Sequence, residues 1–284
     1  MATITRGTRG RVRRRRTRRW HLPALWPGKR RRQRWWRAFR RASGTAQVLT
    51  LGVCLALVAL GVNWIYQASR KPSELLFPVS GVLYKTPSET WSQYAPLFEK
   101  YSTPTMSPEL LAAIAQVEGS GNPIVRTYWR WSWGGPLFEI YRPASSAVGM
   151  FQITDGTFSE SKRYCIRDHA VVEDGPWHDL RSCWFNSLYA RVFPGDAIEL
   201  TSAYLDHHVA LIVARGRHQP VPLPLRQQLA AVIHLCGAGA GEAFAGRGYR
   251  LTEGQRCGDH DVRAYVARID AMRRLFATIE AQSR

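Results

Sequence analysis

The first 45 residues contain no aspartate or glutamate. They hold 17 of the 40 Lys and Arg residues, and Arg70 and Lys71 add two more. From residue 72 to residue 284 the chain carries 21 basic and 21 acidic residues, so the net charge of +19 belongs to the N-terminal part. A neutral remainder offers no basic face for DNA or RNA, and we expect no nucleic-acid partner.

Charge of either sign is missing from residues 42–69. Within this stretch lies VLTLGVCLALVALGVNWIY, residues 48–66, which matches the roughly 20 apolar residues that a helix needs to cross a bilayer. Aromatic residues flank it, as in the belts of membrane proteins: Trp35, Trp36, Trp64 and Tyr66. The run therefore predicts a transmembrane helix over residues 46–67, and a buried helix of a soluble protein is the alternative.

The charge asymmetry predicts the orientation of that helix. The arginine-rich segment 1–45 should stay in the cytoplasm, which places the remainder in the periplasm and makes the chain a single-pass protein of the inner membrane. A cleaved signal peptide fits less well, because the charged segment and the apolar run are both longer than usual. Arg40-Arg41 resembles a twin-arginine export signal, but the residues after it fit that signal poorly.

The chain has only five cysteines, and Cys54 lies inside the predicted span. The other four are even in number and fall on the side expected to be oxidising: Cys165, Cys183, Cys236 and Cys257. Of the three possible pairings we expect the local one, Cys165–Cys183 with Cys236–Cys257, since both bonds close short loops. The alternative is a zinc site of Cys165, His169, His178 and Cys183, whose spacing matches no compact zinc pattern. We expect neither a metal nor a cofactor.

Several catalytic patterns are also missing. The sequence shows no internal repeat, no phosphate-binding glycine loop, and no Ser or Cys nucleophile beside a convincing base. Helical patterns dominate instead and predict a mainly α fold with small β or loop elements. Three helices are expected to start at Thr86, at Ser107 and near Thr154, and the first should bend or stop at Pro96. Three more are expected over residues 196–216, over an apolar segment that ends in the glycines 237–241, and over residues 259–282. His207-His208 should lie on the wetter side of its helix, without carboxylate partners.

One carboxylate stands at an unusual place. In PELLAAIAQVEG, residues 108–119, Leu111, Ile114 and Glu118 share the face that should be buried. The C-terminal end of a helix carries the negative end of its dipole, which is unfavourable for an anion. An apolar surrounding also disfavours the charged form of a carboxyl group. We therefore expect Glu118 to hold its proton near neutral pH, as a general acid does.

Four segments in order resemble the SLT family of lytic transglycosylases, relatives of goose-type lysozyme. They are VEGSGNP with Glu118, GMFQIT at 149–154, SAYL with Tyr204, and AAVIHLCGAG at 230–239. The resemblance covers residues 106–241 and implies a lysozyme-like helical domain over 106–284, reached through a tether and first helix over 68–105. It implies Glu118 as catalytic acid/base, with a substrate-binding set of Ser120, Gly149, Met150, Gln152, Tyr204 and His234.

The resemblance also implies an activity, cleavage of the β-1,4 bond between N-acetylmuramic acid and N-acetylglucosamine in peptidoglycan glycan strands with a 1,6-anhydro product. Two departures leave alternatives open. Gly119 replaces the Ser that follows the family's Glu, and His234-Leu235 replaces its Tyr-Asn pair, so that His234 is either a substitute polar neighbour of the Glu or a core histidine. A lysozyme-like hydrolase, with Glu139 or Asp155 positioning water, and a non-catalytic glycan- or partner-binding module remain as other functions. By analogy a secretion or conjugation assembly is a further partner.

The segment TYWRWSWGGPLFEIYRP, residues 127–143, is rich in aromatic residues. Such rings stack on sugar faces in a saccharide groove, or they cover a hydrophobic core as a cap. The sequence favours the cap for most of them.

Overall fold

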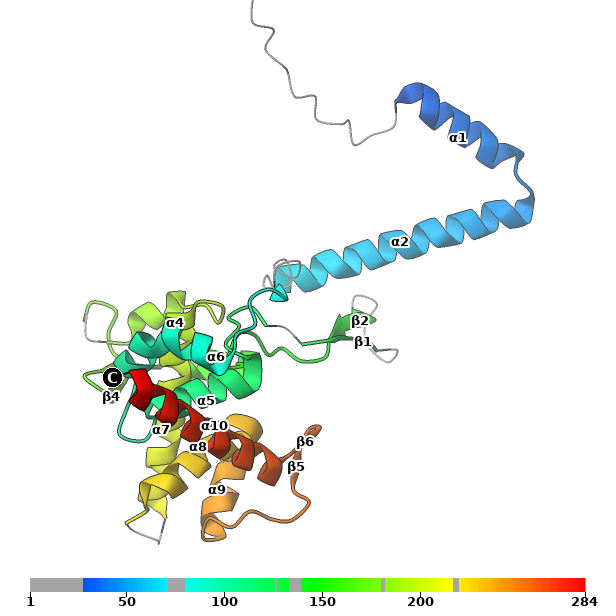
Figure 1. Cartoon of the computed structure of the whole chain (residues 1–284). Helices are drawn as coiled ribbons and strands as arrows, with labels where there is room; N and C mark the ends of the chain where they lie inside the picture. The colour runs from blue at the N-terminus through cyan, green and yellow to red at the C-terminus, as the bar shows by residue number, and fades with distance from the viewer. Residues whose placement is uncertain are drawn as a thin grey trace, which may run out of the picture. The chain divides into compact units, whose positions relative to one another are not determined.

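The computed structural model describes residues 28–70, 80–125, 127–132, 139–179, 182–216 and 220–283. The chain divides into two units, residues 1–59 and 60–284. In the described residues helices dominate, and the strands form small two-stranded antiparallel sheets (Figure 1). The expected mainly α fold is confirmed, while the lysozyme-like arrangement stays a prediction.

The first unit contains helix α1 (Lys29–Arg41) and most of helix α2 (Gly44–Arg70). Among the described residues α2 is the one helix that is long and apolar enough to cross a membrane. Its apolar side chains are left uncovered, and Val48 and Leu55 are 70% and 69% exposed. Such exposure is unfavourable in water and is removed by lipid. The chain therefore has one candidate membrane helix near its N-terminus.

The second unit is built from longer helices. They are α4 (Pro87–Lys100), α5 (Pro108–Gly119), α7 (Pro194–Arg215), α8 (Leu223–Cys236), α9 (Ala238–Gly246) and α10 (Val262–Ser283), with the short α6 (Asp155–Ser161) and a 3-10 helix, η3 (Trp184–Leu188). The predicted caps are confirmed. Thr86 and Glu89 form a capping box, and Ser107 accepts a hydrogen bond from the Leu110 N–H at the start of α5.

Two expectations about helix ends are met only in part. Helix α4 was expected to bend or stop at Pro96, and it does not stop there but continues to Lys100, because Phe98 beyond it is fully buried in the core and its packing outweighs the lost hydrogen bond. Helix α8 ends at Cys236 with Gly237 as its cap, as expected, but α9 begins at once and contains the other glycines. Gly241 lies inside α9, where a Cβ would stand 2.5 Å from Ile233 Cγ1, so it serves close packing of α9 on α8 rather than helix termination.

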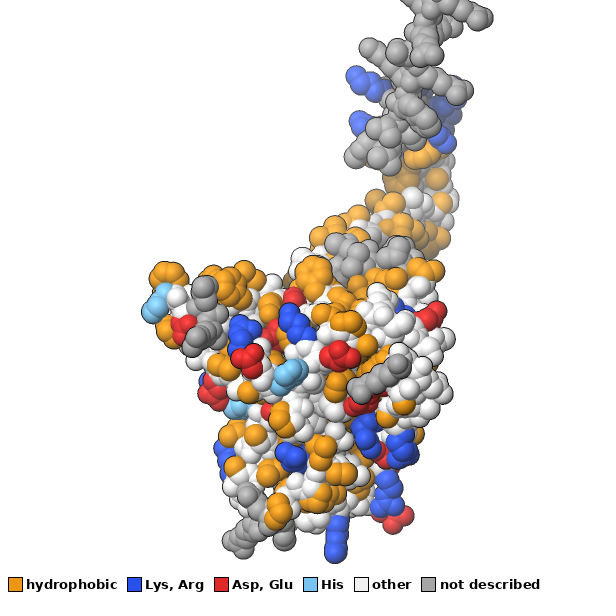
Figure 2. All heavy atoms as spheres, turned by 60° about the vertical axis from the view of Figure 1, so that its left-hand side comes forward, with side chains coloured by type: hydrophobic (Ala, Val, Ile, Leu, Met, Phe, Trp, Pro, Cys, Tyr) orange, Lys and Arg blue, Asp and Glu red, His pale blue; other side chains and the backbone are white. Residues whose placement is uncertain are grey.

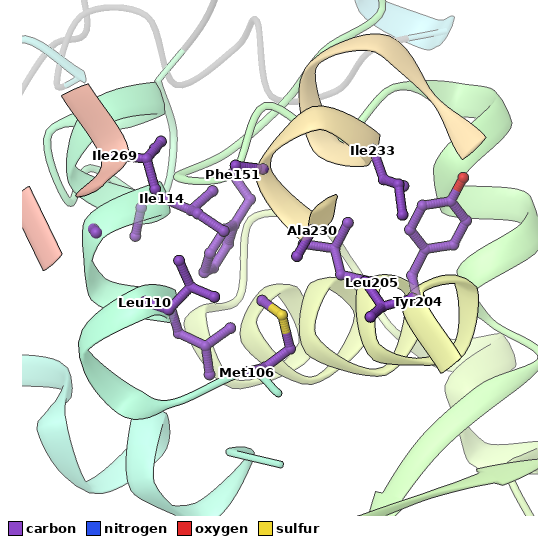
Figure 3. Packing of buried hydrophobic residues seen from close by; sticks show 14 of the residues in the cluster. Met106, Leu110, Ile114, Phe151, Tyr204, Leu205, Ala230, Ile233 and Ile269 are labelled. Carbon is purple, nitrogen blue, oxygen red and sulfur yellow. The ribbon is translucent and has the colours of Figure 1, made fainter. Parts of the chain in front are cut away.

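The core of the second unit lies among its helices. Helix α5 packs against α4 and α10, and α7 packs against α8. Figure 3 shows side chains of α5, α7, α8 and α10 meeting in one cluster with Phe151 and Met106. Leu110, Ile114 and Leu205 are no more than 1% exposed. The face of this unit turned to the viewer in Figure 2 carries acidic and basic side chains interspersed, as its neutral composition predicts.

Three hairpins complete the described part of the second unit. Strands β1 (Trp129–Trp131) and β2 (Tyr141–Pro143) pair first, β3 (Tyr164–Arg167) pairs with β4 (Ala170–Glu173), and β5 (Arg256–Cys257) pairs with β6 (His260–Asp261). The two expected disulfides are confirmed: Cys165 is bonded to Cys183 and Cys236 to Cys257. Both fit an oxidising compartment. They also occupy the two sulfur atoms that the zinc alternative needed.

Candidate active site

Glu118 lies in the last turn of α5, as its place in the sequence predicts. The apolar residues of the same helix, Leu111 and Ile114, are fully buried, whereas the Glu118 side chain keeps 18% exposure. The helix ends at Ser120, which has a left-handed backbone (φ 48°) and donates its N–H to the carbonyls of Ala115 and Gln116. This reversal leaves Glu118 at the edge of the core, where a carboxylate is mostly buried but still reachable.

Two side chains from other helices meet this carboxylate. The Tyr265 hydroxyl on α10 donates a hydrogen bond of 2.5 Å to Glu118 Oε1. His234 Nε2 on α8 lies 3.6 Å from the same oxygen, and the His234 side chain is 11% exposed. Of the two readings of His234, the structure supports the polar neighbour of Glu118. Tyr265 was not predicted as a site residue, although a hydroxyl-bearing residue within the apolar stripe of the last helix was a signal.

The charge state of Glu118 differs from the expectation. Burial is the largest influence and raises the pKa of its carboxyl group, as predicted. The hydrogen bond and charge of His234, the hydrogen bond of Tyr265 and the charge of His260 act the other way, and together they hold the pKa below its usual value. The expectation that Glu118 holds its proton near neutral pH is therefore wrong for the free protein, because its partners outweigh its burial.

The same contact raises the pKa of Tyr265. Burial is the first cause, and the charge of Glu118 and the hydrogen bond to it are the next. Tyr265 therefore remains a protonated donor at neutral pH and holds the carboxylate in one orientation.

The Cys236–Cys257 disulfide joins the elements that carry these partners. Cys236 ends α8, two residues after His234, and Cys257 lies in β5. Strand β6 follows with His260 and leads directly into α10, which carries Tyr265. The bond therefore fixes the end of one helix against the start of the other, on either side of Glu118.

A tight turn at residues 148–153 packs directly beneath the end of α5. A Cβ at Gly119 would lie 2.8 Å from Met150 Cα and 2.9 Å from Met150 O. Gly149 has φ +80°, and a Cβ there would lie 2.2 Å from the Arg191 carbonyl oxygen. The close contact between α5 and this turn therefore leaves no room for a side chain at position 119.

His234 lines a cavity of about 210 Å³, whose lining does not include Glu118. Three of the predicted substrate-binding residues, Gln152, Tyr204 and His234, line it together. Gln152 has a left-handed backbone (φ 47°), and its side-chain amide donates to the Gly149 carbonyl at 2.9 Å. Burial raises the pKa of Tyr204 to about 12, so its hydroxyl is a donor at neutral pH. The cavity offers hydrogen-bonding groups of the kind that bind sugars.

The other predicted binding residues lie elsewhere. Met150 is fully buried in the core, Gly149 shapes the turn, and Ser120 caps α5, where its carbonyl accepts from the Lys85 N–H at 2.9 Å. None of the three lines the cavity beside His234. Their role in binding substrate stays a prediction.

Two further carboxylates were considered as water-positioning groups. Glu139 pairs with Arg142 at 2.8 Å, and Asp155 pairs with Arg191 at 2.8 Å. They line a separate cavity of about 160 Å³ together with Gln67 and Ser146. Each is held by an arginine.

The expectation for His207-His208 is wrong. Their side chains are only 13% and 14% exposed, and both have carboxylate partners: His207 Nδ1 lies 3.4 Å from Glu173 and His208 Nε2 lies 3.0 Å from Glu160. The partners come from β4 and α6, which the fold brings beside α7 and which the local sequence does not reveal. In the described residues no group of three or more His, Cys, Asp or Glu is placed to hold a metal ion.

No protein-family model matches the sequence, and no curated protein matches it significantly. The resemblance to the transglycosylases therefore rests on the four segments alone. The geometry adds that two of them, the helix end with Glu118 and the helix with His234, meet in space.

Proposed function

We propose that this chain is a membrane-anchored peptidoglycan lytic transglycosylase that cleaves the MurNAc-β-1,4-GlcNAc bond, with Glu118 as acid/base. The observation that carries the proposal is the Glu118 carboxylate itself. It is partly buried at a helix end, bonded to Tyr265, and 3.6 Å from His234, which itself lines a cavity with Tyr204 and Gln152. A carboxylate held in one orientation by neighbouring side chains is the arrangement that acid–base catalysis requires.

The reaction needs two proton transfers, and Glu118 takes part in both. Glu118 gives a proton to the glycosidic oxygen as the bond from C1 of N-acetylmuramic acid to that oxygen breaks. The resulting carboxylate then takes the proton of the same sugar's 6-hydroxyl as O6 bonds to C1. The product is a 1,6-anhydro sugar, no water is consumed, and Glu118 returns to its protonated state. Because the second reactant belongs to the substrate, a second carboxylate is not needed.

The lowered pKa of Glu118 in the free protein is compatible with this scheme because of the separate influences that set it. Burial already favours the protonated form more than any other single influence. A sugar ring over the exposed part of the Glu118 side chain increases its burial, which raises the pKa of the carboxyl group further. The hydrogen bonds from the neighbouring side chains stay as they are. His234 Nε2 lies 3.6 Å from the same carboxylate.

The placement of the other carboxylates supports a single acid/base. Glu139 and Asp155 are each engaged by an arginine, in a cavity whose lining includes neither Glu118 nor His234. The arginine-rich N-terminus, α2 and the two disulfides support a periplasmic catalytic domain on a single inner-membrane anchor. Such a domain opens the wall locally, and a secretion or conjugation assembly is its partner by analogy.

Mass analysis of a peptidoglycan digest tests the proposal. Purified sacculi treated with the full-length protein should release muropeptides that end in 1,6-anhydro sugar. Products with a free reducing end would replace the proposal with a lysozyme-like hydrolase. Binding to sacculi without any released product would replace it with a non-catalytic glycan-binding module, the function that the loss of the family's Tyr-Asn pair at His234-Leu235 favours.

A further inference from the structure

The hairpin of β1 and β2 has two chemically different faces. Its register pairs Trp131 with Tyr141, Arg130 with Arg142, and Trp129 with Pro143. Since side chains alternate along a strand, the rings and Pro143 share one face and the two arginines share the other. Ring centroids of Trp129 and Trp131 lie 5.1 Å and 4.8 Å from that of Tyr141, which makes the ring face continuous.

The ring face is open to solvent at Trp131, which is 53% exposed, while Trp129, Tyr141 and Pro143 are partly buried. Tyr128, which precedes the strand, is 67% exposed. The sequence-based reading of these aromatics as a hydrophobic cap is therefore wrong for Trp131 and Tyr128. Exposed Trp and Tyr side chains beside a candidate membrane helix are typical of the membrane–water interface.

The hairpin is bonded to the end of the candidate membrane helix. Asn63 Nδ2, from the part of α2 that belongs to the second unit, donates to the Tyr141 carbonyl at 2.6 Å, and Asn63 and Gln67 are buried. Asn63 is three residues before Tyr66, the last residue of the apolar run 48–66, which is roughly 5 Å along a helix. Strand β2 therefore lies at the depth where a spanning α2 leaves the hydrocarbon.

The charges on the other face fit lipid phosphate. Arg130 and Arg142 stand directly opposite each other, an arrangement of like charges that weakens a strand pair. Glu139 engages Arg142 at 2.8 Å, and within the described residues no carboxylate forms an ion pair with Arg130. A guanidinium group binds a phosphate through two parallel hydrogen bonds.

We propose that the β1–β2 hairpin docks in the headgroup layer of the membrane that α2 crosses. The ring face lies toward the acyl boundary, where Trp and Tyr are enriched, and the arginine face binds lipid phosphates. The inference rests on α2 being a membrane span, which is part of the proposed function, but not on glycan cleavage. It assigns the hairpin the role of holding the second unit against the bilayer surface.

A fluorescent label at the hairpin tests this in full-length protein. Tyr128→Cys in a Cys54→Ala background carries the label, and Glu253→Cys, an exposed position between α9 and β5, is the matched control. Nanodiscs contain phosphatidylcholine and phosphatidylglycerol with a spin label on the headgroup or in the mid-acyl chain. We expect headgroup quenching severalfold stronger at position 128 than at position 253, and weaker mid-chain quenching at both.

Arg130→Gln with Arg142→Gln separates phosphate binding from general proximity. Each arginine lost should lower the docked-to-free ratio of the hairpin about fivefold in membranes rich in phosphatidylglycerol. Equal quenching at positions 128 and 253 in correctly inserted protein would overturn the docking. The docking would also be overturned if lipid did not change the fluorescence of the label at position 128 but soluble glycan fragments did. That result would make the ring face a saccharide-binding surface.

The outcome is separable from the catalytic proposal. Glu118→Gln should dock like the wild type, because the hairpin does not use that carboxylate. Extraction of the protein from membranes by alkaline carbonate would show that α2 does not span, and would overturn the anchor and the docking together while leaving the chemistry of Glu118 to its own test.

Discussion

At the scale of single residues, the Tyr265 hydroxyl is the contact that distinguishes Glu118 from an ordinary carboxylate at a helix end. Its hydrogen bond stabilises the charged form, so Tyr265→Phe should raise the pKa of Glu118. Isotope-edited infrared titration of glutamate-labelled protein, with the Glu118→Gln spectrum subtracted, measures that pKa. The limb of the activity profile that belongs to Glu118 should move to higher pH by the same amount. An unchanged or lower pKa would contradict the role given to Tyr265.

His207 links folding stability to pH. Burial is the first cause that lowers its pKa from 6.5, and His208 adds to it, while Glu173 acts in the opposite direction. Between the folded pKa and pH 6.5, His207 therefore binds a proton in the unfolded chain but not in the folded protein. The contribution of neutral His207 to the free energy of unfolding is fully present above pH 6.5 and is lost as the pH falls through the lower folded pKa.

Replacing His207 by Phe, which can keep the 4.1 Å ring contact with Tyr164, should flatten the fall of the melting temperature between about pH 7 and pH 5. His178→Gln, at an exposed position, is the control and should leave the slope unchanged. Thermal unfolding at a series of pH values measures this. A slope as steep in His207→Phe as in the wild type would show that another group is responsible.

Glu118 and His234 could be chosen from the sequence because each belongs to a local pattern, a capped helix with a buried face and a segment in the family order. Their mutual distance could not, and neither could Tyr265, which is 147 positions from Glu118 along the chain. The charge state of Glu118 was misjudged for the same reason. A pKa depends on neighbours in space, and the sequence showed only the apolar neighbours in the same helix.

At the scale of elements, the account depends on the contact between the end of α5 and the turn at residues 148–153. Gly119→Ser places a Cβ against the backbone of Met150, which cannot move aside as a flexible side chain would. We expect a loss of about 1–3 kcal/mol in the free energy of unfolding. Gly156→Ala in α6, where a Cβ meets nothing within 4 Å, is the control.

Gly156→Ala should be neutral or stabilising by about 0.4–1 kcal/mol, since alanine restricts the unfolded chain. Chemical denaturation of both variants measures the difference. If Gly119→Ser were as stable as the wild type, the close packing of α5 on the turn would not require glycine at position 119.

Helix starts were predictable because their signals are local: Thr86 with Glu89, and Ser107 with Pro108, satisfy the first N–H groups within a few residues. Helix interiors and ends that depend on packing were not. The burial of Phe98 carries α4 past Pro96, and the contact of α9 with Ile233 explains Gly241. The pairing of the cysteines was predictable because both loops are short.

At the scale of the whole molecule, α2 and the charge asymmetry predict one topology. Protease added to spheroplasts should digest the chain from residue 70 onward and leave the arginine-rich N-terminus protected. Immunoblotting with a tag at each end measures which end survives. Protection of the C-terminal part would reverse the orientation and remove peptidoglycan as a substrate.

The central claim is that one carboxylate carries out the cleavage, and the release of anhydro-muropeptides by three variants tests it most directly. Glu118→Gln keeps an oxygen that can accept from Tyr265 but cannot deliver a proton, so the release rate should fall by about 10²–10⁴-fold at unchanged melting temperature. The matched controls Glu139→Gln and Asp155→Asn, at arginine-paired carboxylates, should stay within a few-fold of the wild type. Near-wild-type release by folded Glu118→Gln, or an equal loss in either control, would contradict the account.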